Sequence, residues 1–221
     1  MSSVIDPIEM PEFTGDGLEI IGTDGFNALY GTDEGDFIEA RGGNDLIVGR
    51  AGNDLIDGGT GDDLIDGGTG DDSIFGMGGK DVIFGDAGED VISSGEGNDI
   101  VFAGSGNDLI HSDGGDDTVY GGAGNDTIYG GVGNDVLFGG AGEDVFEYAA
   151  EDFSSEFISR VGDFDFDEDS LVITGLDSSD RVTFDFKSGN LSVNGTNGVN
   201  LKELGDSDDL DMNDNEDFEI V

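Results

Sequence analysis

Apolar residues recur at every ninth position through the middle of the chain. Written in rows of nine from Gly22, residues 22–147 form fourteen rows without an insertion or deletion. The eighth column is apolar in every row and mostly β-branched, from Leu29 to Phe146. Its neighbours in columns seven and nine are expected to point the other way, which is the period-2 pattern of a strand with one buried side. The pattern therefore predicts one three-residue strand per row.

The first six columns of each row are rich in glycine and aspartate, which is typical of a tight turn. Column four is glycine in every row except the second, which has Glu34. Glycine in columns one, two and four is expected to permit the positive φ angles that such a turn needs. Because a three-residue strand is unstable alone, neighbouring rows are predicted to stack into a solenoid.

The sixth column is aspartate in thirteen of the fourteen rows, with Asn27 in the first row. Aspartate also caps turns, but thirteen at one phase exceed what turn chemistry requires. Carboxylate oxygens and the carbonyl oxygens exposed by a glycine-rich turn are the ligands that calcium prefers. The candidate metal ligands are therefore Asp36, Asp45, Asp54, Asp63, Asp72, Asp81, Asp90, Asp99, Asp108, Asp117, Asp126, Asp135 and Asp144.

The rows, such as GGTGDD at residues 58–63, resemble the nonapeptide GGxGxDxUx of the repeats-in-toxin (RTX, hemolysin-type) family of calcium-binding proteins. The resemblance implies an all-β fold, a right-handed parallel β-roll of about seven turns with two rows per turn. It also implies that each calcium ion is shared between aspartates eighteen residues apart, such as Asp54 and Asp72. About ten to twelve calcium ions would then line the two edges of the roll.

The charge of the chain limits the classes of partner that it can bind. Asp and Glu number 53 against 7 Lys and Arg, for a formal net charge of −46 at pH 7. Such a chain repels nucleic acid and anionic membrane surfaces, and no apolar run is long enough to span a bilayer. Stacked carboxylates also repel one another without counter-ions, so we expect the chain to be mostly disordered without calcium and to fold with it.

The outer face of the odd-numbered rows carries an aromatic stripe. Columns seven and nine should point outward, which places Phe84, Phe102, Tyr120 and Phe138 in one line. Because a contiguous apolar patch is rarely left in water, we expect the C-terminal region or a second copy of the chain to cover it. Stacking of the rings without any partner is the alternative.

The period stops after Glu147 and divides the chain into three expected parts. Residues 1–21 form an N-terminal segment with a short capping strand, 22–147 the fourteen-repeat roll, and 148–221 a β-rich cap with a secretion signal. The stretch Ile158–Gly175 is similar to the cap that follows RTX repeats, and a solenoid needs such a cap to close its last layer. Strands in this part are expected at Phe157–Val161, Leu171–Thr174, Val182–Phe186, Leu191–Val193 and Phe218–Val221.

The two ends of the chain indicate export. Residues 214–221, DNEDFEIV, resemble the uncleaved C-terminal signals of type I secretion substrates. The N-terminus lacks the basic and apolar regions of a cleaved signal peptide. We therefore expect a secreted, extracellular protein that the type I secretion machinery exports without a cleaved N-terminal signal.

The sequence offers little for catalysis, so we expect a protein that is not an enzyme. Its one histidine, His111, is expected at an outward strand position, so metalloprotease and Ser-His-Asp sites are unavailable. The run Asp163-x-Asp165-x-Asp167 does not match an EF-hand, since the glycine of position six and the glutamate of position twelve are missing. A lone additional cation there remains an alternative.

The resemblance leaves two main functions open. The first is a secreted calcium-binding RTX protein with a structural, adhesive or extracellular-matrix role. The alternative is a non-catalytic RTX module of, or partner to, a secreted hydrolase or polysaccharide epimerase, although about twenty residues before the repeats are too few for a catalytic domain. Ice binding is disfavoured because column three lacks a regular row of Thr or Asn.

Overall fold

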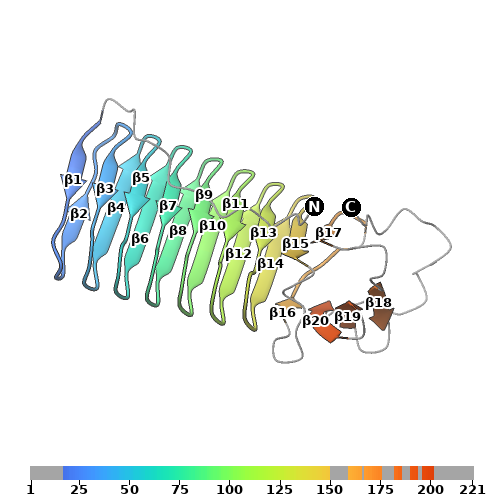
Figure 1. Ribbon diagram of the computed structural model, residues 1–221. Coiled ribbons are helices and arrows are strands. Elements are labelled where there is room, and N and C mark those ends of the chain that lie inside the picture. Colours follow the sequence, from blue (N-terminus) through green and yellow to red (C-terminus); the bar gives the residue numbers. More distant parts are fainter. Residues whose placement is uncertain are drawn as a thin grey trace.

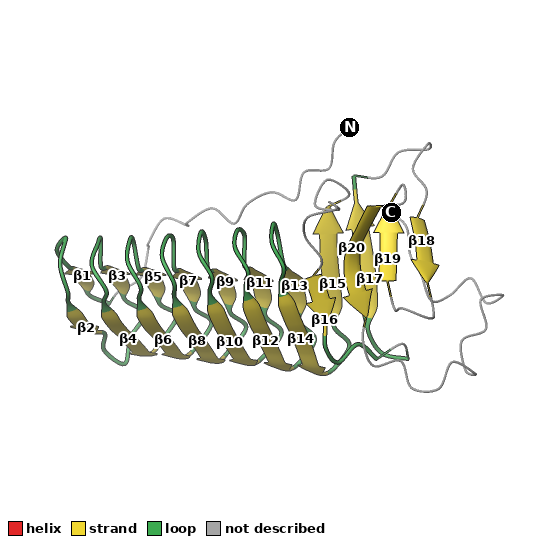
Figure 2. Cartoon of the chain, turned by 90° about the horizontal axis from the view of Figure 1, so that it is seen from below, coloured by secondary structure: helices red, strands yellow, loops and turns green. Residues whose placement is uncertain are grey.

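A computed structural model of the chain describes residues 17–149, 159–165, 167–175, 182–185, 190–193 and 196–201. Within these ranges the chain winds as a flattened coil of short strands, seen from the side in Figure 1 and from below in Figure 2. No helix in the described part has the length and hydrophobicity needed to cross a bilayer.

The strands form two sheets, and the chain alternates between them. Strands of even rows lie in one sheet and strands of odd rows in the other, called here the even-row and odd-row sheets. The even-row sheet has the order β1 (Glu19–Ile21), β3 (Phe37–Glu39), β5 (Leu55–Asp57), β7 (Ser73–Phe75), β9 (Val91–Ser93), β11 (Leu109–His111), β13 (Thr127–Tyr129), β15 (Val145–Ala149) and β17 (Ser170–Thr174). The odd-row sheet runs β2 (Ala28–Tyr30), β4 (Leu46–Ala51), β6 (Leu64–Thr69), β8 (Val82–Ala87), β10 (Ile100–Ser105), β12 (Thr118–Ala123), β14 (Val136–Ala141), β16 (Ser159–Val161), β20 (Thr196–Leu201), β19 (Asn190–Val193) and β18 (Val182–Asp185).

Neighbouring strands of the repeats are parallel and pair residues that lie eighteen positions apart. Ile65, for example, is in register with Ile47 on one side and with Ile83 on the other. Eighteen residues are two rows, so each turn of the coil takes one row into each sheet. The structure thus confirms an all-β solenoid of about seven turns with two rows per turn.

The core is a double stack of column-eight side chains between the sheets. Leu29 is partly buried, and from Ile38 to Phe146 every column-eight side chain has an exposed fraction of 0%. One such side chain per row leaves little apolar area for each turn. Fully burying an aliphatic side chain contributes about 1.5–3 kcal/mol, which is comparable with the entropic cost of ordering one or two residues.

The strands of the two sheets differ in length, which the row pattern did not predict. Between the first and last turns, even-row strands have three residues, as expected, whereas odd-row strands have six. The odd-row strands are longer because they continue into the following row, whose columns two and three stay paired, as Ala51 does with Thr69. At the opposite edge, only an isolated bridge forms at column three, as between Gly42 and Thr60.

Positive φ angles occur in columns two and four but not in column one. In column four, Gly61 has φ of 129°, and a side chain there would collide with the carbonyl oxygen of Gly43 in the preceding turn. Column two keeps positive φ even at non-glycine residues, including Arg50 at 87° and Met77 at 75°. The expectation that column-one glycines serve the backbone conformation was therefore wrong, and their role is spatial, as shown below.

After the repeats the chain adds strands to both sheets. β17 pairs with β15, and β16 pairs with β14, so each sheet is extended by one parallel strand. β20 then pairs with β16, and β19 and β18 follow antiparallel at the edge of the odd-row sheet (Figure 2). Four of the expected strand regions contain strands. β20 was not anticipated, and the expected strand Phe218–Val221 lies outside the described residues.

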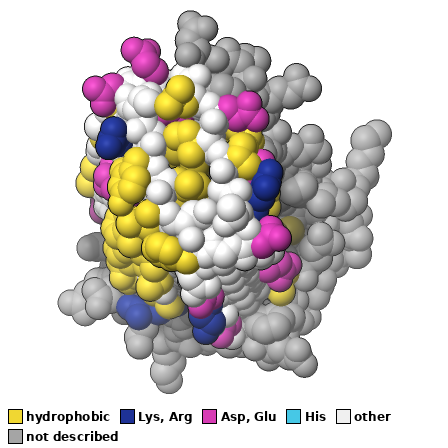
Figure 3. All heavy atoms as spheres, turned by 90° about the vertical axis from the view of Figure 1, so that its left-hand side faces the viewer, with side chains coloured by type: hydrophobic (Ala, Val, Ile, Leu, Met, Phe, Trp, Pro, Cys, Tyr) yellow, Lys and Arg dark blue, Asp and Glu magenta, His cyan; other side chains and the backbone are white. Residues whose placement is uncertain are grey.

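The N-terminal end of the roll presents apolar side chains. Leu18, Phe26 and Tyr30, in or near the first turn, have exposed fractions of 53%, 74% and 50%. Figure 3 looks onto this end and shows hydrophobic side chains gathered there among a few charged ones. The first turn of the roll is thus less completely closed than the turns behind it.

Candidate metal centres

The thirteen column-six aspartates line the two edges of the roll, where the chain turns from one sheet to the other. Each one stands at the end of its turn, directly before the strand of its row, as Asp72 does before β7. All thirteen are buried, with exposed fractions of 0–3%. Burying an unpaired carboxylate costs folding free energy, so the carboxylates at each edge need a hydrogen-bond donor or a positive charge to offset that cost.

One carboxylate oxygen of these aspartates bridges neighbouring turns. The backbone N–H of Asp54 donates to Oδ1 of Asp72, and that of Asp72 donates to Oδ1 of Asp90, both at 2.8 Å. The same bond joins all eleven pairs of column-six aspartates eighteen residues apart, at 2.7–3.2 Å. The pairs expected from the sequence, such as Asp54 with Asp72 and Asp63 with Asp81, therefore lie in direct contact.

The second carboxylate oxygen is buried and has no hydrogen-bond partner at eleven of the thirteen aspartates. Leaving a buried acceptor unsatisfied costs about 1–3 kcal/mol, and more when it is charged. A row of such atoms at one phase of a repeat therefore indicates places for a cation. The aspartates concerned are Asp45, Asp54, Asp63, Asp72, Asp81, Asp90, Asp99, Asp108, Asp117, Asp126 and Asp144.

Column-one glycines form the wall of the space into which these oxygens point. A Cβ placed on Gly85 would lie 2.5 Å from Oδ2 of Asp90 and 2.5 Å from the carbonyl oxygen of Ala103 in the next turn. At Gly121 the corresponding distances, to Asp126 Oδ2 and to the carbonyl oxygen of Gly139, are 2.5 and 2.7 Å. Ten of the fourteen rows have glycine in column one, where a carboxylate and a carbonyl oxygen converge; the exceptions are Ala40, Ser94, Ala103 and Ser112.

The donor set suits a hard cation such as calcium. Each gap between turns offers carboxylate and carbonyl oxygens, which calcium binds in sets of about six to eight. Among the described residues, no group of three or more His, Cys, Asp or Glu side chains is disposed to hold a metal ion. Backbone carbonyls must therefore complete any site in the roll, which agrees with the glycine-rich turns that expose them.

The electrostatics of the edges also favour a cation. Burial, together with the charges of aspartates in adjacent turns, raises the pKa of Asp72 and of Asp117 to about 8. Burial likewise raises the pKa of Asp81 and of Asp126 to about 7. In each case the N–H group donated by the preceding turn acts in the opposite direction but does not offset burial.

Two turns on one edge carry serine in place of the column-one glycine. Ser94 Oγ donates to the carbonyl oxygen of Ser112 at 3.1 Å, and Ser112 Oγ donates to the carbonyl oxygen of Gly130 at 2.8 Å. At these turns a hydroxyl group occupies the space that the column-one glycines leave open. The spaces beside the column-six aspartates therefore differ from turn to turn.

A second ladder, in column five, was not recognised in the sequence. Its exposed side chains accept the backbone N–H of the residue eighteen positions later, as Asn107 Oδ1 does from Asn125 at 2.8 Å and Asp116 Oδ1 from Asn134 at 2.9 Å. Column-six side chains reach toward the preceding turn, whereas these reach toward the following one. The recurrence of Asn and Asp in column five, nine rows of fourteen, was the available indication.

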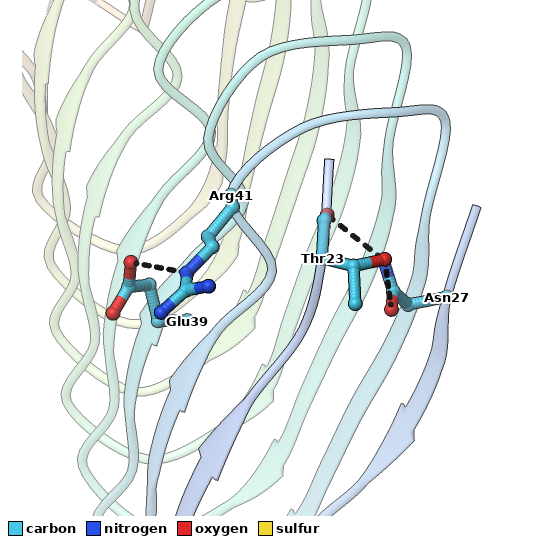
Figure 4. Close-up of polar contacts among 4 residues, drawn as sticks. All are labelled: Thr23, Asn27, Glu39 and Arg41. Atoms are coloured by element: carbon cyan, nitrogen blue, oxygen red, sulfur yellow. Dashed lines mark hydrogen bonds and ion pairs between the residues drawn. The ribbon is translucent and has the colours of Figure 1, made fainter. Parts of the chain in front are cut away.

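The first turn departs from the pattern. Asn27 takes the place of aspartate, and its N–H donates to Asp45 Oδ1 at 2.6 Å. Its side-chain amide also donates to Asp45 Oδ1, at 3.1 Å, and Asn27 Oδ1 accepts from Thr23 Oγ1 of its own turn at 3.2 Å (Figure 4). In the same view Arg41 forms an exposed ion pair with Glu39 at 3.2 Å. This end therefore offers a cation less negative charge than the interior turns.

The histidine lies at its expected strand position but is buried. His111 occupies an outward column of β11, but its exposed fraction is 6%. Its ring packs edge-on against Tyr129, with centroids 5.3 Å apart, in a groove that Asp113 and Val132 also line. Burial lowers the pKa of His111, which favours the neutral imidazole. His111 thus takes the outward position predicted from the sequence, but the following turns and Tyr129 enclose its side chain.

The aromatic stripe forms a continuous stack on the odd-row sheet. The rings of Phe84, Phe102, Tyr120 and Phe138 follow one another at centroid distances of 5.1, 5.0 and 4.9 Å, with interplanar angles of 9°, 3° and 2°. Phe102 and Tyr120, in the middle, remain 36% and 37% exposed. At the cap end, a side chain on Gly162 would collide with the Phe138 ring, so the cap backbone covers that ring.

Comparison with models of known families matches the repeats. The model described as the RTX calcium-binding nonapeptide repeat, in four copies, matches residues 21–56, 57–92, 75–110, 84–119 and 111–146. Together these matches span residues 21–146, more than half of the chain. No curated protein matches the chain.

Proposed function

The chain belongs to the family of RTX calcium-binding nonapeptide-repeat proteins, and on this premise we propose that its column-six aspartates are the calcium ligands of the roll. The observation that carries the proposal is the row of eleven buried Oδ2 atoms without a hydrogen-bond partner. The aspartates named from the sequence, Asp36 to Asp144, would contribute the carboxylates, and the carbonyl oxygens that face column one would contribute further ligands.

At the eleven aspartates with an unpartnered Oδ2, the two carboxylate oxygens can have different roles. Oδ1 accepts the N–H of the preceding turn and thereby fixes the orientation of the carboxylate. Oδ2 is then held toward the column-one glycine, where it is free to bind a cation. Bound calcium supplies positive charge at the edges, where neighbouring carboxylates otherwise repel one another.

We propose that calcium binding and folding of the roll are one process. The chain carries a net charge of −46, and its core is a single stack of side chains on each sheet. Cation binding therefore makes up a large share of the folding free energy. The proposal allows one site per gap between turns, about ten to twelve in all, with the serine turns as the first candidates for weaker sites.

A calcium titration of the chelator-treated chain tests this function. Far-UV circular dichroism should show a cooperative gain of β structure with calcium, and isothermal calorimetry should count several ions per chain. Magnesium at the same concentration is the control, because it demands a tighter octahedral site and should induce much less structure. Identical spectra in chelator and in millimolar calcium would refute the proposal.

We further propose a secreted, structural or adhesive role. Proteins with RTX repeats are typically secreted, and the roll is a calcium-binding structural module. The acidic and apolar C-terminal residues 214–221 support export by a type I system. Calcium-dependent folding would suit that route, since the chain would remain unfolded where calcium is scarce and fold where it is abundant.

The exposed aromatic stack supports a second copy of the chain as a partner. Phe102 and Tyr120 lie at the centre of the stack and retain more than a third of their surface in water. Two rolls that face each other through this stripe would bury it on both copies. Light scattering of the calcium-bound protein tests this proposal.

A further inference from the structure

A groove opens on the edge where the chain passes from the even-row sheet to the odd-row sheet. It is centred on Gly114, which pairs through isolated bridges with Glu96 in the preceding turn and with Val132 in the following one. Because Gly114 has no side chain, only backbone lies between Glu96 and Val132, which are two turns or about 10 Å apart. The resulting groove has a volume of about 800 Å³.

His111 lines this groove and supplies a buried polar group without a hydrogen-bond partner. Its side chain has an exposed fraction of 6%, and its imidazole forms no hydrogen bond with any other described residue. The contact with Tyr129 is an edge-on contact between rings. Since buried polar groups are normally hydrogen-bonded, the imidazole points to a ligand that binds in the groove.

Two carboxylates lie beside the imidazole. That of Glu96 extends over the groove floor, because a Cβ on Gly114 would lie 3.2 Å from its Oε2. That of Asp113 is held in place by Ser93, whose Oγ donates to Asp113 Oδ2 at 2.7 Å. None of the described residues that line the groove is Lys or Arg. The groove therefore suits a ligand that carries positive charge and donates hydrogen bonds.

The arrangement of these acceptors favours an organic cation over a metal ion. They do not converge on one point, since no three His, Cys, Asp or Glu side chains in the described part of the chain are disposed to hold a metal ion. A guanidinium group carries five N–H donors around a planar frame, so it can reach acceptors on separate walls. Tyr129 offers an aromatic ring to its face, and Val132, which is 52% exposed, can pack against the alkyl chain of an arginine.

The same place two turns earlier lacks these polar groups. Gly78 leaves open space there in the same column. Phe75, however, takes the place of His111, and Met77 takes the place of Asp113. The polar lining of the groove thus belongs to one part of the roll and does not follow from the repeat.

We propose that this groove binds the guanidinium group of an arginine side chain from a partner polypeptide. Glu96 and Asp113 would accept its N–H groups, and the unprotonated ring nitrogen of His111 would accept one more. The net charge of −46 would also attract a basic partner. None of these residues is a column-six aspartate, so the proposal goes beyond calcium binding and does not depend on which aspartates hold the ions.

The single histidine provides the measurement. His111 gives the only imidazole signal in proton NMR spectra of the full chain without an affinity tag. The chain is titrated in calcium-containing buffer, at constant ionic strength, with N-acetylarginine amide and with N-acetyllysine amide. We expect the arginine compound to shift the His111 signal to saturation. The lysine compound should bind at least about tenfold more weakly, because a compact ammonium cannot reach separated acceptors.

Free arginine distinguishes the source of the guanidinium group. Its α-carboxylate is repelled by the acidic groove, so it should bind more weakly than the blocked compound. Equal or tighter binding of free arginine would overturn the assignment to a polypeptide side chain. Equal binding of the lysine compound, or a His111 signal that does not respond to the arginine compound, would overturn the guanidinium site.

Two double variants test the carboxylates. Glu96→Gln/Asp113→Asn removes both charges, and asparagine tolerates the positive φ of 62° at position 113. We expect the affinity for N-acetylarginine amide to fall at least about tenfold. The control, Glu89→Gln/Glu143→Gln, removes the same charge from exposed positions on the opposite edge and should bind as the wild type does.

Equal affinities of the two double variants would overturn the site. Far-UV circular dichroism verifies that each variant is folded. Should Glu96→Gln/Asp113→Asn fail to fold, the titration is made on Glu96→Gln, whose exposed side chain tolerates the change. An unchanged affinity in that variant overturns the site as well.

Discussion

Asp72 and Asp90 stand in consecutive turns of one edge, and the backbone N–H of Asp72 donates to Oδ1 of Asp90 at 2.8 Å while Oδ2 of each residue is buried without a partner. Oδ1 thus fixes the orientation of the carboxylate, and Oδ2 is left available to a cation. The relationship recurs along both edges of the roll.

Removing one ladder carboxylate should weaken calcium-dependent folding. In Asp72→Asn one oxygen can still accept the N–H of Asp54, but the negative charge is lost. We expect the calcium midpoint of folding to rise about tenfold, or ~1.4 kcal/mol. The matched control is Asp71→Asn, at the neighbouring exposed position, where the amide oxygen can still accept the N–H of Glu89. Equal midpoints for the two variants, measured by circular dichroism, would contradict a ligand role for Asp72.

Acid should partly replace calcium. The folded-state pKa values of Asp72 and Asp117, about 8, and of Asp81 and Asp126, about 7, lie above the ordinary value of 3.8. The folded roll therefore binds more protons than the unfolded chain, and its stability falls as pH rises. This contribution is complete below pH 3.8 and is lost as pH rises through 7 to 8.

The measurement is the β signal of the chelator-treated chain between pH 8 and pH 4. We expect it to increase on acidification. Calcium affinity should decrease over the same range, because protons compete for the same carboxylates. A signal that stays constant or decreases toward pH 4 would show that these aspartates do not govern folding.

Filling the space at column one should disturb a single gap. The backbone of Gly85 does not have a positive φ, so alanine is tolerated conformationally, but its Cβ would lie 2.5 Å from Asp90 Oδ2 and from the carbonyl oxygen of Ala103. We expect Gly85→Ala to lower stability in saturating calcium by about 1–3 kcal/mol. Gly78→Ala is the control, because a Cβ there meets no atom within 4 Å. If the two variants unfold at the same temperature, the space at Gly85 is not crowded.

Replacing the centre of the aromatic stack should dissociate the proposed pair of rolls. Phe102→Ser/Tyr120→Ser removes the two middle rings, whose centroids are 5.0 Å apart. We expect the wild type to scatter light as a dimer in calcium and the variant as a monomer with an unchanged far-UV spectrum. Tyr30→Ser removes an exposed aromatic from the same sheet outside the stack and should leave the dimer intact. If the wild type scatters light as a monomer in calcium, the proposed dimer is wrong and the rings stack without a partner.

The repeat predicted most of the roll because its period fixes the fold directly. Once Ile65 must pair in register with Ile83, the column-six aspartates are necessarily stacked at the edges. The expectation of three-residue strands failed on one sheet because strand length depends on pairing between turns, which no single row contains. The burial of His111 was missed for a related reason, since residues of other turns enclose it.

The nine-residue period could not predict which residues end the two aspartate ladders. Ser159 and Asp169 occupy the next places on the two edges, but they lie 24 and 25 residues after Asp135 and Asp144 instead of eighteen. Only the pairing of β16 and β17 with the last turn brings them there. The secretion signal and the remainder of the cap stay predictions.

The eighteen-residue offset between paired strands also limits how such a chain can vary in length. Excising residues 58–75 would leave every later strand on its original sheet, and the flanking turns could pair again in register. Excising nine residues would transfer every later strand to the opposite sheet. The stacked rings that follow the excision would then lie on the other outer face of the roll. We therefore expect the chain to tolerate the gain or loss of two repeats, whereas the gain or loss of one repeat would exchange the sheets of all later strands.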